Sequence, residues 1–188
     1  MQKRTRLIGN PYYDIRLPSL RTEDVEFFNE EEFIEQMNLG IEWNGMPDSL
    51  YGVTTHSPLS VRKAVAKMAK YFKMEFQYDF LQYTATDEQE SARAFLFTTL
   101  NLNSYTHVHR DPSEVIVVGG CCFRWREWTD ADPGWAMQWI WMHPFFRNRG
   151  NLSEAWPFFC KRFGLFKVEG PLSRAMVRFL ETHPHITQ

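Results

Sequence analysis

The residues best suited to chemistry are concentrated where an apolar stretch meets an arginine-rich turn. That stretch ends with the residues from Trp139 to Met142, and Arg147-Asn148-Arg149-Gly150-Asn151-Leu152 follows it. We expect a strand, a turn and then a helix over 151–163. The first N–H groups of a helix have no partner inside the helix, and the helix dipole adds partial positive charge. With two guanidiniums nearby, the turn is predicted to bind a pyrophosphate.

The two arginines of this turn also have a plainer interpretation. Arg147 and Arg149 could be ordinary solvated loop residues, and in another setting that interpretation would be preferred. The order of strand, turn and helix favours the phosphate site instead.

This stretch resembles the acyl-CoA-binding motif of the GNAT (Gcn5-related) N-acetyltransferases. In that motif an Arg or Gln, two variable residues, a Gly and one variable residue precede a Gly or Ala. Arg147 and Gly150 match the pattern, and Leu152 replaces the final small residue. The resemblance covers about residues 80 to 183. It implies a sheet that splits between two strands, with the thioester arm of the cofactor in the gap, and we expect that gap between the strands over 115–128 and 135–142.

The resemblance also implies which backbone groups would bind acetyl-CoA, the expected acyl donor. The pantetheine amides would pair with backbone groups of Trp139, Ile140, Trp141 and Met142. The pyrophosphate would be held, beside Arg147, by backbone N–H groups of Asn148, Arg149, Gly150, Asn151 and Leu152. Many GNAT proteins place an Asn and then a Tyr general acid after the fifth strand. The matching positions here are Leu172 and Phe179, and neither can donate a proton.

Three side chains are candidates for acid–base chemistry. Acetyl transfer to an amine needs a neutral amine, stabilisation of an oxyanion and a proton for the departing thiolate. Glu127 and His143 are the candidate bases, and Ser173 is the candidate acid. Their structural alternatives are a surface carboxylate, a turn residue before Pro144 and a helix N-cap, respectively.

Arg124 and Arg126 alternate with Trp125, so they should share one face of a strand. There they could form ion pairs or bind an acidic group of a substrate. The tryptophans at 135, 139 and 141 also alternate, and we expect them to line the core and the cleft rather than to stack on bases.

A zinc site is the weakest of the chemical hypotheses. His107 and His109 fall on the same side of an extended segment, and Cys121 and Cys122 lie on a possible neighbouring strand. Adjacent cysteines point to opposite faces of a strand, so only one thiolate could join. We therefore expect no metal.

Composition restricts the class of protein further. A chain of 188 residues suits one domain, or one domain with an N-terminal extension. A net charge of -2 offers no global attraction for nucleic acid or an acidic membrane. We expect the lysines at 63, 67 and 70 to form a solvated helix face.

The cysteines and the apolar runs indicate the compartment. Three cysteines cannot form an even disulfide framework, and no apolar run is long enough for a membrane span, so a cytoplasmic protein is expected.

The periodicity of the chain predicts an α/β (α+β) protein with a mixed, mostly antiparallel sheet and flanking helices. We divide it into an N-terminal helical extension over 1–75 and a GNAT-like core over 76–188. The expected helices are 30–38, 59–72, 151–163 and 171–180. The expected strands are 76–84, 94–100, 115–123, 135–142 and 165–168, with a hairpin turn at 130–134.

The predicted function is transfer of an acetyl group from acetyl-CoA to a primary amine. The alternative is a non-catalytic GNAT-like protein that binds acyl-CoA or a protein partner, and binding of nucleic acid or a membrane is not expected. The acceptor stays open, and so does the oligomeric state, with a homodimer as one possibility.

Overall fold

The computed structural model describes residues 15–25, 47–86, 92–99 and 113–185. Its strands are β1 (Ser19–Arg21), β2 (Leu50–Val53), β3 (Ala92–Thr99), β4 (Glu114–Arg126), β5 (Gly134–Met142) and β6 (Lys167–Val168). Its helices are α2 (Leu59–Phe76), α3 (Asn151–Phe163) and α4 (Arg174–Thr182), with a short 3-10 helix at Pro144–Phe146.

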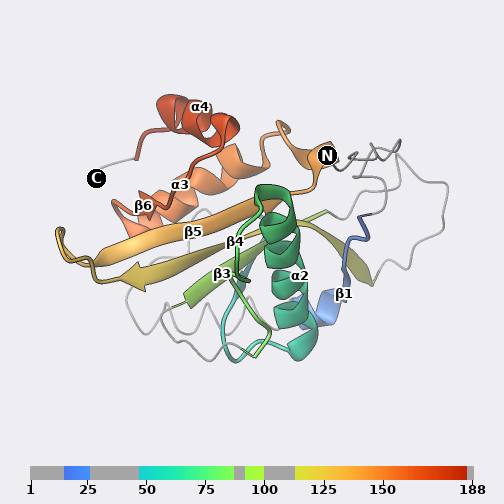
Figure 1. The fold of residues 1–188 in the computed structure, drawn as a ribbon. Helices are drawn as coiled ribbons and strands as arrows, with labels where there is room; N and C mark the ends of the chain where they lie inside the picture. Colours follow the sequence, from blue (N-terminus) through green and yellow to red (C-terminus); the bar gives the residue numbers. More distant parts are fainter. Residues whose placement is uncertain (1–14, 26–46, 87–91, 100–112, 186–188) are drawn as a thin grey trace, which may run out of the picture.

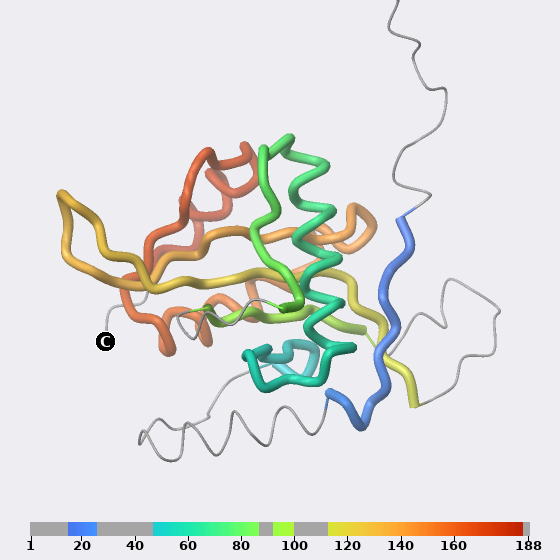
Figure 2. The backbone as a smooth tube through the Cα atoms, turned by 60° about the horizontal axis from the view of Figure 1, so that its bottom comes forward, coloured from blue at the N-terminus to red at the C-terminus, as the bar shows by residue number. Residues whose placement is uncertain are grey.

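The described strands form one mixed sheet. Its order is β2-β3-β4-β5-β6, and β1 pairs with the start of β4. The pairs are antiparallel except β5 with β6, which is parallel. Helix α2 covers one face, and α3 and α4 lie on the other (Figures 1 and 2). The predicted fold class, a mostly antiparallel sheet with flanking helices, is therefore confirmed.

Each face of the sheet has its own hydrophobic core. The apolar stripe of α2 packs on one face, where Met68 and Phe72 meet Trp139 and Trp141 of β5. The aromatic residues of α3 fill the other face, where Phe159 and Phe163 pack on sheet side chains. The adjacent cysteines of β4 are divided between the two cores as strand geometry requires: Cys122 faces α2 and Cys121 faces α3. The described cysteines are buried and form no disulfide.

A β-bulge at Gln138 changes the direction of β5. The pairing of β5 with β4 passes from Phe123↔Met137 to Cys122↔Trp139, so Gln138 has no opposite residue. One extra residue shifts the alternation, and every later side chain changes face. As a result Trp139 lies in the α2 core, whereas Trp135 packs on the α3 side. The three tryptophans of this strand therefore do not share a face.

The sheet opens between β5 and β6, directly after the bulge. The two strands pair only at Ala136 and Met137, and a last hydrogen bond joins the N–H of Glu169 to the carbonyl of Met137 at 2.9 Å. The bulge bends β5 away, and no described strand pairs with that side of Gln138–Met142. The prediction that the gap lies between the strands over 115–128 and 135–142 is wrong. Strand β4 pairs with β5 from Gly119↔Met142 to Arg126↔Gly134.

The predicted strand over 76–84 is also wrong. Helix α2 continues to Phe76 because the apolar spacing of four residues continues from Phe72, whose ring lies 5.0 Å from that of Phe76. Gln77 then adopts a left-handed conformation, φ 58°, and ends the helix, with its N–H donating to the carbonyl of Lys73. Residues 78–86 form bends and turns. The aromatic alternation that suggested a strand belongs to a helix end and a loop.

The C-terminal half follows the prediction closely. Strands β3, β4 and β5 and helix α3 are confirmed, and Gly150 is the N-cap residue of α3. Helix α4 begins at Arg174, three residues after the predicted start. The helix predicted over 30–38 lies outside the described residues. The division of the chain at residue 75 stays a prediction, but β1, β2 and most of α2 precede it and pack with the same sheet.

Candidate functional site

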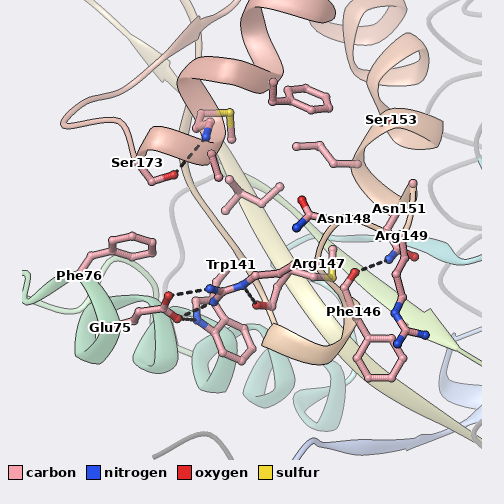
Figure 3. Close-up of a pocket in the computed structure, with 17 residues that line it drawn as sticks. Glu75, Phe76, Trp141, Phe146, Arg147, Asn148, Arg149, Asn151, Ser153 and Ser173 are labelled. Carbon is pink, nitrogen blue, oxygen red and sulfur yellow. Dashed lines mark hydrogen bonds and ion pairs between the residues drawn. The ribbon is translucent and has the colours of Figure 1, made fainter.

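The gap between β5 and β6 leads into a pocket of about 340 Å³. Its wall includes the last residues of β5, the turn before α3 and the start of α4 (Figure 3). Most residues predicted to bind a cofactor line it: Ile140, Trp141, Met142, Arg147, Asn148, Arg149, Gly150, Asn151 and Leu152. Trp139, the remaining one, lines a smaller neighbouring pocket. The structure thus brings the predicted strand end and turn together around one cavity.

The turn before α3 presents open backbone N–H groups to this pocket. No described residue accepts a hydrogen bond from the backbone N–H of Asn148, Gly150, Asn151, Leu152 or Ser153. The first such bond of the helix runs from Glu154 to the carbonyl of Gly150, at 2.9 Å. We call residues 148–153 the amide turn. Apart from Arg149, its residues combine backbone donors that have no described partner with the positive end of the α3 dipole, which is the arrangement that binds anions.

Two left-handed residues give the amide turn its shape. Asn148 has φ 56° and Gly150 has φ 87°. Asparagine tolerates this conformation better than most residues, and glycine adopts it without steric cost. A Cβ at Gly150 would find ordinary space, 3.6 Å from Oε1 of Glu154, so the dihedral angle and not crowding explains the glycine. Alternating backbone conformations of this kind turn successive N–H groups toward one point.

Arg147 is already bound within the protein. Its guanidinium forms two hydrogen bonds with the Glu75 carboxylate, at 2.8 and 2.6 Å, and its Nε donates to the carbonyl of Met142 at 2.8 Å. Nε1 of Trp141 donates to the same carboxylate at 2.8 Å (Figure 3). Helix α2 is thereby tied to the end of β5 and to the start of the turn. The role of Arg147 toward phosphate stays a prediction, and in this structure its guanidinium is engaged by Glu75.

Arg149 and Asn148 point in different directions from the turn. The guanidinium of Arg149 lies 5.8 Å from the centre of the Phe146 ring, at the edge of the pocket. The side-chain amide of Asn148 points toward the space below α4 (Figure 3). Asn151 fixes the turn from behind, since its Nδ2 donates to the carbonyl of Phe146 at 2.9 Å. Arg149 is therefore the arginine whose charge is placed at the mouth.

A second, smaller pocket of about 50 Å³ adjoins the first one. The two cavities share Phe76, Ile140 and Ser173 as lining residues. The small pocket lies where β5 and β6 part, and its wall combines aromatic side chains with one carboxylate, Glu169. These wall residues come from the end of α2, the bulge of β5 and the segment after β6: Phe72, Tyr78, Met137, Gln138, Trp139, Val168, Glu169, Pro171 and Leu172.

Of the three predicted catalytic residues, only Ser173 lies at these pockets. It lines both, and it is also the N-cap of α4, because its Oγ accepts a hydrogen bond from the N–H of Met176 at 3.2 Å. The N-cap alternative is thus confirmed for this serine. Glu127 is exposed on the loop after β4 and lines neither pocket, as its surface alternative anticipated.

His143 also lies outside both pockets; it is buried, and its ring lies edge-on to that of Trp141. Its Nδ1 accepts a hydrogen bond from the N–H of Phe145 at 3.3 Å, so the ring caps the short 3-10 helix. Burial, and then the positive charge of Arg147, lower the pKa of His143 below its usual value. This histidine has the structural role that its position before Pro144 suggested.

Three side chains of the candidate site were missed by reasoning from the sequence. Glu75 binds Arg147, Glu169 pairs with Arg126 at 2.6 Å, and Tyr78 lines the small pocket beside Glu169. Tyr78 falls within the strand predicted over 76–84, and Glu75 directly precedes that strand, so the partners of both residues could not be assigned. The ion pair of Arg126 agrees with one of the two alternatives for that arginine.

Arg124 has a different environment on the same face. Its side chain is buried, its Nε donates to Oε1 of Gln138 at 2.7 Å, and its Nη2 donates to the carbonyl of Gln82 at 3.3 Å. Gln138 in turn donates to Oε1 of Gln82 at 2.7 Å. These contacts give the bulge residue a fixed position and so stabilise the opening of the sheet.

Two searches for other kinds of site were negative within the described ranges. No three His, Cys, Asp or Glu side chains lie close enough together there to hold a metal ion, and His107 and His109 fall outside those ranges. None of the described helices combines the length and the apolar character needed to cross a bilayer.

Comparison with solved structures identifies the fold. The xEco2 acetyltransferase domain bound to a CoA conjugate matches with a TM-score of 0.50 at 13% identity, over 76% of this chain and 88% of that one. A ribosomal-protein-alanine N-acetyltransferase from Brucella melitensis biovar Abortus 2308 matches with a TM-score of 0.43 at 13% identity, over 74% and 91% of the two chains. Searches against protein-family models and curated proteins find no match. The chain has a GNAT-like fold, as the sequence resemblance implied.

Proposed function

We propose that this protein is an N-acetyltransferase that moves an acetyl group from acetyl-CoA to a primary amine. The observation that carries the proposal is the amide turn at 148–153. Its open N–H groups lie at the mouth of a pocket that begins where β5 parts from β6. A pyrophosphate at the turn and a pantetheine arm along the free side of β5 would satisfy both sets of backbone groups.

The backbone of this chain would do most of the binding. The N–H groups of the amide turn would hold the pyrophosphate, and Arg149 would add positive charge at the edge. Backbone groups of Gln138–Met142 that face the gap would pair with the pantetheine amides, as an added strand would. Arg147 would act indirectly, because Glu75 already occupies its guanidinium. The cofactor itself supplies the activated thioester.

The chemistry would take place where the two pockets meet. A backbone N–H of β5 would stabilise the developing oxyanion, in the manner of an oxyanion hole. Glu169 is the carboxylate of the small pocket, and it would accept a hydrogen bond from the acceptor amine and so orient it. Glu127 and His143 line neither pocket, and the proposal assigns no step to them.

Calorimetry with acetyl-CoA on two glycine variants tests the binding site. Gly150→Ala forces a left-handed residue to carry a Cβ, so the amide turn would lose its shape and affinity would fall about tenfold or more. Gly164→Ala is the matched control, since Gly164 ends the same helix with φ 63° and an added Cβ there meets nothing within 4 Å. Equal affinity for the two variants, or no binding by the unaltered protein, would refute the proposed site.

A non-catalytic acyl-CoA-binding protein is the second candidate. Leu172 and Phe179 cannot donate a proton, and they stand at the positions where the resemblance implies polar side chains. This alternative requires tight binding of acetyl-CoA without release of free CoA across a broad panel of amines. An acceptor-dependent release of CoA from at least one amine would establish the transferase instead.

A further inference from the structure

Tyr78 has a fixed position at the small pocket. It is the second residue after α2, and its N–H donates to the carbonyl of Lys73 at 3.2 Å. Its ring stacks on Phe72, with centroids 4.9 Å apart and an angle of 27° between the planes. Phe72 also contacts Phe76 and Trp139, so the tyrosine ring belongs to a packed aromatic cluster that forms one wall of the cavity.

The phenol hydroxyl of Tyr78 is a donor without a partner in the described part of the chain. No hydrogen bond of this hydroxyl to a described residue occurs, although Glu169 lines the same pocket. Burial, and then the negative charge of Glu169, raise the pKa of Tyr78 above its usual value of 10. The phenol therefore carries its proton throughout the physiological pH range.

The other polar side chains of the small pocket are less suited to give up a proton. Oγ of Ser173 caps α4, and an aliphatic hydroxyl is a far weaker acid than a phenol. The amide of Gln138 donates to Gln82. The indole N–H of Trp139 is buried, and an indole is a hydrogen-bond donor and not an acid under these conditions. Among these lining groups the phenol is the strongest neutral acid.

We propose that Tyr78 donates the proton that the thiolate of CoA needs when the thioester is cleaved. This proposal rests on the proposed function and deepens it. The two pockets meet at Phe76, Ile140 and Ser173, so a thioester arm that follows β5 from the amide turn reaches the wall that holds Tyr78. The proton donor then comes from the end of α2, and not from the segment after β6.

The lone pair of a neutral amine forms the new C–N bond, and the carbonyl π electrons move to oxygen. Collapse of the tetrahedral intermediate breaks the C–S bond and leaves the electron pair on sulfur. Tyr78 transfers its phenol proton to that sulfur, the nitrogen loses a proton to solvent, and the tyrosinate recovers one from solvent. Overall one proton moves from the amine to the thiol.

The test compares two tyrosine variants with the unaltered full-length chain. Tyr78→Phe keeps the ring that stacks on Phe72 and removes only the hydroxyl. Tyr71→Phe is the matched control, because Tyr71 also lies on α2 and has a raised pKa from burial, but its hydroxyl donates to the carbonyl of Arg16 at 2.8 Å and it lines neither pocket. For Tyr78→Phe we expect kcat to fall about 100-fold with the Kd for acetyl-CoA unchanged.

A second measurement does not require an acceptor. The ionisation constant of the CoA thiol bound to the protein can be followed by the ultraviolet absorption of the thiolate. A phenol donating to that sulfur stabilises the thiolate, so Tyr78→Phe should lower the ionisation constant roughly tenfold, whereas Tyr71→Phe should leave it unchanged.

The outcomes separate the two proposals. If the unaltered protein binds no CoA, the proposed function fails, and the assignment of Tyr78 fails with it. A different result is that CoA binds, but Tyr78→Phe has the same bound-thiol ionisation constant and the same turnover rate as the unaltered protein. In that case only the assignment of Tyr78 is overturned. Binding with the expected change in the thiol, but without turnover, would support the position of Tyr78 next to sulfur and favour the non-catalytic alternative.

Discussion

The two pockets are built in opposite ways. The amide turn of the large pocket is one continuous segment of six residues, and it presents backbone N–H groups. The small pocket takes its wall from the end of α2, the bulge of β5 and the segment after β6, and it presents side chains. A site made of backbone depends on local conformation, whereas a site made of distant side chains depends on how the cores pack. Substitutions should therefore affect the two pockets differently.

The largest effect is expected in the wall of the small pocket. Trp139 is 2% exposed and packs in the α2 core, so Trp139→Ala should lower the free energy of unfolding by about 3 to 5 kcal/mol. Urea denaturation measures this loss. Trp125→Ala is the control, since Trp125 is 44% exposed and truncation there should cost far less. Similar losses for the two variants would mean that the wall of the pocket is not part of the core.

The contact between Glu75 and Arg147 connects the two regions. If Arg147 acts by holding the turn, Glu75→Gln should weaken binding of acetyl-CoA roughly tenfold, because a charge-assisted pair is lost and the turn loosens. If Arg147 instead binds phosphate directly, Glu75→Gln would free the guanidinium and strengthen binding. Calorimetry distinguishes these results by their sign.

A double variant sharpens the same test. Glu75→Gln combined with Arg147→Gln should bind acetyl-CoA no worse than either single variant, since both substitutions break one contact. Losses that add in full would show that the two residues act independently, and the account of Arg147 as a positioning residue would then be wrong.

Glu154 should have a smaller effect, confined to the amide turn. Its carboxylate lies close to Gly150, in the first turn of α3, where a negative charge favours the helix but repels a bound pyrophosphate. Glu154→Gln should therefore tighten binding of acetyl-CoA by roughly two- to fivefold, and high salt should reduce the difference. Calorimetry at two salt concentrations measures this. A weaker affinity in the variant would place the phosphates elsewhere.

The smallest effect is expected from His143, which caps the short 3-10 helix between β5 and α3. Its pKa is lowered in the folded protein, so below about pH 6.5 the unfolded chain binds a proton that the native chain does not. The stability that His143 contributes is thus complete above that pH and is lost as the pH falls. Urea midpoints at about pH 7 and pH 5 should differ less in His143→Asn than in the unaltered protein. An unchanged difference would contradict a neutral, buried ring.

The sequence predicted the region of the amide turn well because its signals are local. Arg147, Gly150 and an amphipathic stretch with Gly164 at its end define a strand, turn and helix without knowledge of the rest of the chain. The hairpin between β4 and β5 is equally local, with a turn rich in Asp, Pro and Gly. Even here the ion pair of Arg147 was not foreseen, since its partner Glu75 lies 72 residues away.

The small pocket could not be predicted, for two physical reasons. The end of α2 was missed because Phe76 and Tyr78 fit a strand period as well as a helix end, and only the left-handed Gln77 decides between them. The gap was assigned to the wrong pair of strands because a bulge at Gln138 leaves no mark in the apolar pattern. Without these two features, neither Tyr78 nor Glu169 could be placed at the site.

The amino-acid sequence by itself determined the order of the C-terminal elements and the open N–H groups before α3, since both follow from propensities and dihedral angles within a few residues. Only the tertiary structure decided which strands separate, which acid binds Arg147 and which phenol lines the small pocket. Those outcomes depend on contacts between segments far apart in the chain, and such contacts form only when the two cores pack against the sheet.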